Sequence, residues 1–185
     1  MRADTVVDTE RLVLRRWRDD DAGEFAAINA DRGVMRFIGA GAPLSRTQSD
    51  ELLRRFESEW DERGFGLWAV EDREGGPLLG FCGLTVPMFL PAVLPAVEVG
   101  WRLAPHAWGR GIATEAAQAA LAFGFEALGM REIISIVHPG NDRSLRVCSK
   151  LGMDARPDRM HPATRQRLKV LGIGPTELQW DAIHH

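Results

Sequence analysis

The sequence contains no tyrosine and only two cysteines, Cys82 and Cys148. Neither cysteine belongs to a CxxC pair or to a cysteine–histidine cluster, so the pattern predicts neither a disulfide scaffold nor a zinc site. An excess of basic residues is missing too, because the formal net charge of the 185 residues is −3. A protein that binds nucleic acid needs surplus lysine and arginine to neutralise phosphates, so we expect no nucleic-acid partner.

Long apolar segments are also absent. The most apolar stretch, residues 86–97, is interrupted by three prolines, whereas a membrane-spanning helix needs about 20 apolar residues. No apolar segment of the kind found in signal peptides follows the first four residues. We therefore expect a cytoplasmic protein that does not associate with membranes.

The composition is that of a globular domain, with 45% hydrophobic and 26% charged residues. At roughly 100–200 residues per domain, the length favours one domain over residues 1–185. Its recognisable motifs lie within residues 9–153, and residues 154–185 have a less regular pattern.

Helical periodicity is clearest in two segments. Ser45 and Gln48 match a capping box, apolar residues follow at three- and four-residue spacing, and Gly64 is a natural end. The second segment, residues 112–128, is rich in alanine. Asp19 is the expected N-cap of an earlier helix, and Asn141 that of a later one.

Alternating or apolar runs predict strands over residues 12–17, 66–71, 78–86, 97–103 and 132–138. Two short runs near the end, residues 167–171 and 177–180, are candidates for a closing pair of strands. The middle strands form an antiparallel meander, and the later strand–helix–strand unit requires a parallel pair. We expect an α/β (α+β) fold with a mixed, splayed central sheet of six to seven strands flanked by helices.

Two glycines, Gly109 and Gly111, stand between the predicted strand over residues 97–103 and the alanine-rich helix. Glycine lets successive backbone N–H groups point into one concavity, and a helix N-terminus adds about half a positive charge. Such a turn binds phosphate, and Arg110 could add a charge-assisted contact. On spacing alone, an ordinary tight turn explains the glycines equally well.

Two common nucleotide signatures do not fit this turn. The Walker sequence GxxxxGK[ST] is missing, and the third small residue of a Rossmann fingerprint is replaced by Thr114. The acidic residue that such a fingerprint needs at the end of the next strand is missing as well.

The residues around the turn resemble a known family. Residues 108–116 read WGRGIATEA and are similar to the acetyl-CoA diphosphate loop of the GNAT N-acetyltransferases. The sequence EVGWRL at residues 98–103, the pair Asn141 and Ser144, and KLGM at residues 150–153 resemble its RimJ/RimL branch of ribosomal-protein N-acetyltransferases.

The resemblance implies a GNAT-like fold, acetyl-CoA as co-substrate, an amine acceptor and no metal. It also implies that backbone N–H groups near Val99 and Trp101 polarise the thioester carbonyl, and that the strand ending at Leu103 pairs with pantetheine. The positions that it assigns to acetyl-CoA are Trp101, Leu103, Trp108, Gly109, Arg110, Gly111, Ile112, Ala113, Thr114 and Asn141.

Acyl transfer to an amine needs a base for the amine and a proton for the leaving thiolate. Glu98 is the candidate base, because strand alternation places it opposite an apolar face. A solvated glutamate, or one paired with Arg102, is the alternative. His138 is a second candidate base, with a structural histidine as its alternative.

The proton donor is harder to assign, because the absence of tyrosine excludes the general acid that many family members use. The resemblance lets Ser144 donate to the coenzyme A sulfur, and the alternative is an ordinary first-turn serine. Cys148 lies on the apolar side of its helix and is expected in the core, so an acyl-cysteine route is disfavoured.

The acceptor amine is the most open question. A protein N-terminus is the usual acceptor of the branch, a small amine such as an antibiotic or polyamine is an alternative, and a non-catalytic acyl-CoA sensor is another. Residues 87–95 are candidates to cap the acceptor site or to meet a second subunit in a homodimer, and a loop packed against the core is the alternative. Aromatic side chains that could line the acceptor pocket, or else belong to the core, are Trp17, Phe37, Trp60, Trp68 and Trp108.

Overall fold

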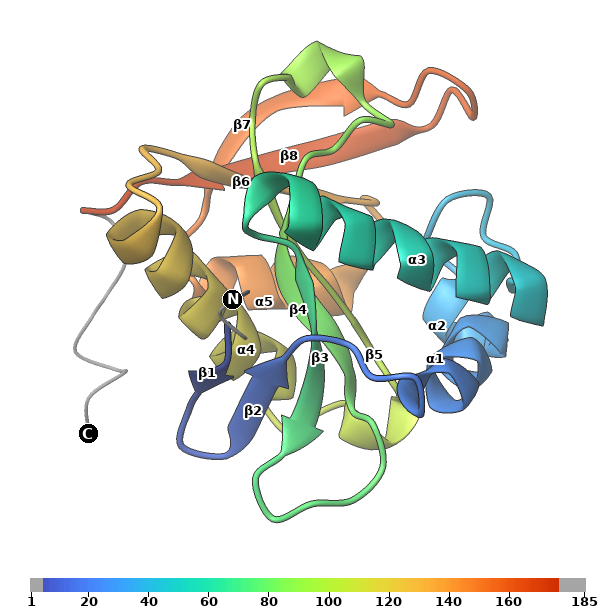
Figure 1. The fold of residues 1–185 in the computed structure, drawn as a ribbon. Coiled ribbons are helices and arrows are strands. Elements are labelled where there is room, and N and C mark those ends of the chain that lie inside the picture. The colour runs from blue at the N-terminus through green and yellow to red at the C-terminus, as the bar shows by residue number, and fades with distance from the viewer. Residues whose placement is uncertain (1–4, 177–185) are drawn as a thin grey trace.

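The computed structural model describes residues 5–176, and within them eight strands form one mixed sheet in the order β1-β2-β3-β4-β5-β6-β8-β7 (Figure 1). All neighbours are antiparallel except β5 and β6, which are parallel. The strands are β1 (Val7–Asp8), β2 (Leu12–Arg15), β3 (Leu67–Asp72), β4 (Gly80–Thr85), β5 (Glu98–Leu103), β6 (Ile133–Val137), β7 (Asp154–Met160) and β8 (Arg167–Ile173).

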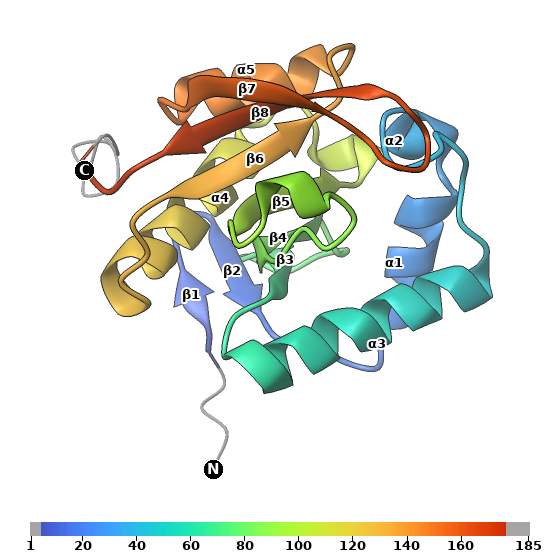
Figure 2. The same ribbon diagram turned by 90° about the horizontal axis from the view of Figure 1, so that it is seen from above.

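Helices cover both faces of the sheet, which confirms the expected mixed α/β architecture (Figure 2). The sheet has one or two strands more than expected, since the short β1 and the edge strand β7 were not predicted. The helices are α1 (Asp21–Ala30), α2 (Arg32–Met35), α3 (Arg46–Arg63), α4 (Ile112–Ala122) and α5 (Asp142–Lys150), with 3-10 turns at Pro91–Val93 and Pro105–Ala107.

Alternation along β3 divides the core into two layers. Trp68 and Val70 belong to the layer that contains the alanines of α4, whereas Leu67 and Ala69 belong to the layer beneath α1 and α3. Because β3 is buried on both faces, its sequence is apolar at four successive positions.

The helix ends follow the local sequence at α3 and depart from it at α1. The hydroxyl of Ser45 accepts from the amide of Gln48, the Gln48 side chain accepts from the amide of Ser45, and Gly64 ends the helix at φ +75°. The prediction that Asp19 caps α1 was wrong, because Asp20 precedes the helix and no side chain among the described residues caps it. The helix begins at Asp21, whose carboxylate binds the buried guanidinium of Arg15 at 2.8 Å.

The alanine-rich segment is helical to Ala127, although only its first part is a regular α-helix. A π-helical turn over Phe123–Ala127 follows α4. Within it, a Cβ added to Gly124 would come within 2.6 Å of the end of the Ile133 side chain on β6, so a larger residue would require that side chain to shift.

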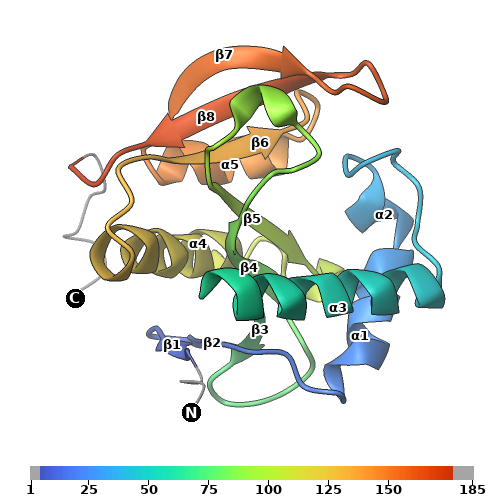
Figure 3. The same ribbon diagram turned by 45° about the horizontal axis from the view of Figure 1, so that its top comes forward.

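Of the two runs expected to close the sheet, residues 167–171 lie in β8, which pairs with β7, and residues 177–180 lie outside the described range. The segment 87–95 packs beside this hairpin through Phe89, which stacks on His161 with ring centroids 5.8 Å apart (Figure 3). Leu90 anchors the segment in the core, whereas Met88 is 63% exposed. Among residues 5–176, no helix is both long and apolar enough to cross a membrane.

Candidate functional site

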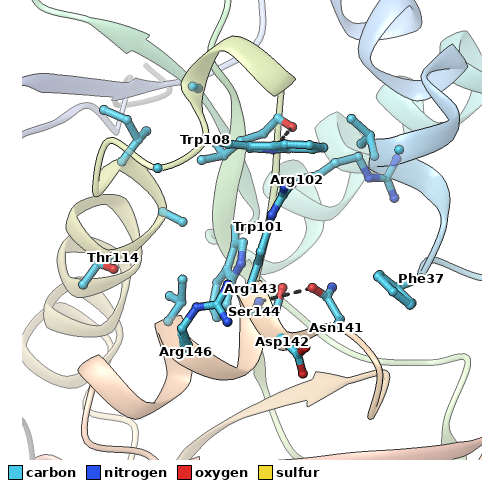
Figure 4. A pocket seen from close by; sticks show the side chains of 18 of the residues that line it. Phe37, Trp101, Arg102, Trp108, Thr114, Asn141, Asp142, Arg143, Ser144 and Arg146 are labelled. Atoms are coloured by element: carbon cyan, nitrogen blue, oxygen red, sulfur yellow. Dashed lines mark hydrogen bonds between the residues drawn. The ribbon is translucent and has the colours of Figure 1, made fainter.

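A cleft of about 760 Å³ opens where β5 and β6 separate (Figure 4). One wall is the carboxyl end of β5 with the turn that leads into α4, and the opposite wall is one face of α5 along its whole length. Residues 33–38, which include the end of α2, line a third side. The cleft therefore lies at the carboxyl ends of two parallel strands, where open α/β sheets commonly bind ligands.

The edge of β5 that faces the cleft has no strand partner beyond Glu98 among the described residues. On its other edge, β5 pairs with β4 at every position from Glu98 to Leu103. Toward β6, the register within the described chain is limited to Glu98 opposite Ile134. Backbone N–H and C=O groups beyond Glu98 are thus free to pair with an extended ligand, as a strand would.

The N-terminus of α4 points its first amides at the cleft. Gly109 has φ +74° and Gly111 has φ +79°, so both positions need the conformational freedom of glycine. No side chain within the described residues caps this helix end. The amides of Ile112, Ala113 and Thr114 have no acceptor inside the helix, and a helix N-terminus of this kind has the geometry and dipole that suit an anion.

A network behind the turn holds this helix end in place. The carboxylate of Glu115 accepts from the Thr9 hydroxyl at 2.6 Å and from the backbone amide of Arg11 at 2.9 Å. The Arg11 guanidinium binds the same carboxylate at 2.7 Å and the carbonyl of Arg110 at 2.9 Å. The amides of the turn are therefore oriented before any ligand arrives.

The first turn of α5 forms part of the opposite wall. The Asn141 side chain accepts from the amide of Ser144 at 3.2 Å, which confirms Asn141 as the helix cap. Trp108 donates from its ring nitrogen to the carbonyl of Leu103 at 2.9 Å, and the guanidinium of Arg143 lies 4.1 Å from the Trp108 ring centroid. This stack joins the two walls across the cleft (Figure 4).

Ten of the twelve predicted site residues line this one cleft, although they come from three separated parts of the chain. They are Trp101, Leu103, Trp108, Gly109, Gly111, Ile112, Ala113, Thr114, Asn141 and Ser144. Arg110 is not among the lining residues, because its guanidinium turns toward Asp72, 3.5 Å away. The other exception is Glu98.

Glu98 lies at the point where β5 and β6 begin to diverge, and it does not line the cleft. The residue is 9% exposed, and its Oε1 accepts from the amide of Ile136 on β6 at 3.3 Å. Burial raises the pKa of Glu98 to about 8, while the bond from Ile136 opposes the shift and the charge of Glu59 adds to it. The alternatives of a solvated glutamate or a pair with Arg102 are therefore wrong, because Arg102 binds Asn29 instead.

The other candidates divide between the cleft and the core. Phe37 and Trp108 line the cleft, whereas Trp17, Trp60 and Trp68 are buried in the core. Cys148 is fully buried, as expected.

His138 stacks on Phe37 with centroids 5.2 Å apart, and its Nδ1 accepts from the amide of Gly140 at 3.0 Å. This nitrogen already serves a structural role in the turn after β6.

Comparison with known proteins places the chain in a family. The family model described as Acetyltransferase (GNAT) domain matches residues 11–154. The chain belongs to the GNAT acetyltransferase family. YkkB of Bacillus subtilis is 33% identical over 159 residues, covering 83% of this chain and 87% of YkkB. The N-acetyltransferase YoaA of the same organism is 29% identical over 147 residues, covering 80% of this chain and 81% of YoaA.

Solved GNAT structures have the same fold. An acetyltransferase from Agrobacterium tumefaciens superposes with a TM-score of 0.78 at 25% identity, over 91% of this chain and 94% of its own. Mycobacterium smegmatis RimJ, solved with CoA-disulfide, gives 0.78 at 20% identity, over 99% and 93%. Spermidine N-acetyltransferase of Vibrio cholerae, solved with CoA and spermine, gives 0.70 at 19% identity, over 90% and 96%.

Sequence reasoning missed most of the positive charge in the cleft of this GNAT domain. The basic residues that line it are Arg36, Arg102, Arg143, Arg146 and Lys150. Three of them were detectable, since Arg143, Arg146 and Lys150 follow helical spacing and share one face of α5. Arg102 gave no such signal, because nothing in the local sequence shows whether a strand arginine is ion-paired.

Proposed function

We propose that this GNAT domain is an acetyl-CoA-dependent N-acetyltransferase in which a primary amine attacks the thioester directly. The observation that carries the proposal is the unpaired edge of β5, which runs directly into the anion-binding turn before α4. An extended chain with amide groups at one end and a diphosphate at the other matches this combination, and the pantetheine and diphosphate of acetyl-CoA have that form.

The residues then divide the work of binding. The amides of residues 111–114 receive the diphosphate, and the edge of β5 from Val99 to Leu103 pairs with pantetheine. Arg143, Arg146 and Lys150 supply positive charge for phosphate groups from the opposite wall. The acetyl group then lies near Gly100 and Trp101, where a backbone N–H stabilises the negative charge that develops on the carbonyl oxygen.

In the chemical step, the amine nitrogen forms a bond to the carbonyl carbon and the carbon–sulfur bond breaks. The proton lost from the amine passes to Glu98 through water. The leaving thiolate accepts a hydrogen bond from Ser144, which lines the cleft, and takes its proton from solvent water. Glu98 is suited to this role because its pKa of about 8 is close to that of an α-amine.

The candidate N-acetyltransferase functions differ in the amine that accepts the acetyl group. RimJ and spermidine N-acetyltransferase share the fold, so the fold alone supports a protein N-terminus and a polyamine equally. Five basic side chains and one carboxylate, that of Asp142, line the cleft, and this charge disfavours a polyamine. We therefore propose an α-amine as acceptor; the RimJ/RimL branch, the homodimer and the cytoplasmic location stay predictions.

Two measurements test the proposal. Calorimetry should detect binding of coenzyme A, and acetyl-CoA mixed with amines should release free thiol together with an acetylated amine of matching mass. Binding without thiol release from any amine would favour an acyl-CoA sensor. No binding of coenzyme A would overturn the assignment of the cleft.

A further inference from the structure

One face of β5 presents a carboxyl, a gap and a cation at alternate positions. Glu98, Gly100 and Arg102 share this face, since side chains alternate along a strand. A Cβ added to Gly100 would have no atom within 4 Å, so open space separates the two charged residues. The acetyl group proposed above lies next to this space.

Arg102 lacks an acidic partner in the described part of the chain. Its guanidinium donates to the side-chain oxygen of Asn29 at 2.5 Å and lies 5.1 Å from the ring centroid of Phe81. The residue as a whole is half-buried, but its Nε is buried and has no hydrogen-bond partner within residues 5–176. Burial lowers the pKa of Arg102 to about 10, so the side chain stays positively charged at neutral pH.

This arrangement is unusual because a desolvated cation is costly unless an anion or several acceptors compensate it. Arg15 is more deeply buried than Arg102, and its Nε also lacks a hydrogen-bond partner among the described residues, but its guanidinium is paired with Asp21 at 2.8 Å and with Glu71 at 2.9 Å. Arg102 differs in that it lines the cleft, where a bound molecule can reach it.

The phosphates of coenzyme A are not the expected anion for Arg102. The amides before α4 and the basic face of α5 lie on the walls that receive them, whereas the Arg102 side chain extends from β5 toward Asn29 on α1 (Figure 4). Arg102 therefore faces the part of the cleft left for the acceptor, beside residues 33–38.

We propose that the acceptor amine carries a carboxylate that binds Arg102. This inference rests on the proposed function and adds a substrate class to it. Gly100 and Arg102 are about 7 Å apart along the strand, so the carboxylate lies a few bonds from the reacting nitrogen. Two kinds of molecule have this chemistry: a free amino acid, and a protein N-terminus with an acidic side chain close to its α-amine.

The competing explanation is structural, with Arg102 serving only to tie β5 to α1. Two variants separate the explanations. Arg102→Gln removes the cation but keeps a side chain able to donate to Asn29. Asn29→Asp keeps Arg102 and places a carboxylate at the atom that it already contacts, which neutralises the cation within the protein. The Ser49 hydroxyl, now 3.2 Å from the Asn29 amide nitrogen, can donate to the new carboxylate.

The experiment compares acceptors that differ in one charge. Thiol release from acetyl-CoA is measured with amino acids against their carboxamides, and with peptides that begin Ser-Asp against Ser-Asn. The wild-type protein should favour the carboxylate of each active pair by roughly 10- to 100-fold in kcat/KM, mainly through KM, as expected for a charged hydrogen bond. Activity on amino acids indicates that the acceptor is a free amino acid. Activity on peptides alone indicates a protein N-terminus with an acidic side chain.

Both Arg102→Gln and Asn29→Asp should reduce this preference to within about threefold and leave coenzyme A affinity unchanged, while Arg102→Lys retains most of it. Equal use of carboxylates and carboxamides by the wild-type protein would overturn the inference and leave the proposed function intact, as would a preference that survives both variants. Absence of thiol release with every acceptor would instead overturn the proposed function, and this inference with it.

Discussion

Glu98 on β5 accepts a hydrogen bond from the amide of Ile136 on β6, with 3.3 Å between Oε1 and N, just beyond the point where the two strands stop pairing. The Glu98 carboxyl thus accepts the hydrogen bond that a backbone carbonyl of β5 would accept if the two strands continued to pair. A charged carboxylate at this buried place is disfavoured, which is why the pKa of Glu98 rises to about 8. Because Glu98 lies where β5 and β6 diverge, the stability of this part of the sheet should depend on pH.

We expect Glu98→Gln to become more stable relative to the wild-type protein as pH rises. Between pH 4.5 and 8, Glu98 is ionised in the unfolded chain and protonated in the folded one, so the wild-type protein loses stability with increasing pH. The difference should grow by a few kcal/mol over this window and level off above pH 8. Urea unfolding at several pH values measures it, and a difference that does not vary with pH would contradict the buried carboxyl.

Thiol release should rise with pH through an apparent pKa near 8 if Glu98 is the base, because only its ionised form accepts a proton. An acceptor amine with a pKa below about 6 is neutral throughout, so any such rise belongs to the protein. Glu98→Gln should lose at least about 100-fold in kcat and show no pH dependence near 8. Its affinity for coenzyme A should equal that of the wild-type protein in calorimetry.

The proposed diphosphate site can be tested by substituting two glycines that have similar positive φ angles, one in the cleft and one outside it. Gly109→Ala places an alanine at φ +74° in the cleft, and Gly129→Ala places one at φ +64° outside it; neither added Cβ meets an atom within 4 Å. Both should lose about 1–2 kcal/mol of unfolding free energy. Gly109→Ala alone should weaken coenzyme A binding, by roughly tenfold. Equal affinities in the two variants would argue against the turn as the binding site.

Local signals predicted the elements whose ends are set by nearby residues. The capping box of Ser45 and Gln48 and the cap at Asn141 each depend on a contact three residues away, so they are visible in the sequence. Strand β7 could not be found in this way. Its sequence DARPDRM is an exposed edge with a proline, and it has no alternation of apolar residues.

In the candidate site, too, the features set by nearby residues were predictable and those set by distant residues were not. The residues of the turn before α4 carry a contiguous motif, and they line the cleft as expected. The environment of Glu98 depends on Ile136 and Glu59, which are distant in sequence, and that of Arg102 depends on Asn29 and Phe81. Burial and charge compensation at these two positions are decided by partners that no local pattern reveals.

The role of Ser144 can be separated from simple helix capping. Ser144→Ala keeps the backbone amide that Asn141 caps, so the free energy of unfolding should change little. Without the hydroxyl, kcat for thiol release should fall roughly tenfold, the equivalent of one hydrogen bond to the leaving sulfur. Ser149→Ala is the control, since it is exposed on the same helix outside the cleft and should leave kcat unchanged.

The network at Glu115 should couple stability to binding. Glu115→Ala removes the acceptor of the Arg11 amide and the nearer acceptor of the Thr9 hydroxyl, which keeps only the Leu12 carbonyl at 3.4 Å, and it should lower the unfolding free energy by about 1–3 kcal/mol. Most of this loss comes from these two hydrogen bonds, because the Arg11 side chain is 45% exposed and its ion pair adds little. Glu126→Ala, at an exposed glutamate in the turn after α4, is the control.

Coenzyme A affinity should fall in Glu115→Ala as well, although Glu115 does not line the cleft. The reason is that Arg11, once released from Glu115, no longer holds the Arg110 carbonyl that orients the turn. Saturating coenzyme A should then raise the melting temperature of this variant less than that of Glu126→Ala. Equal ligand-induced shifts would mean that the amides before α4 keep their orientation without the network.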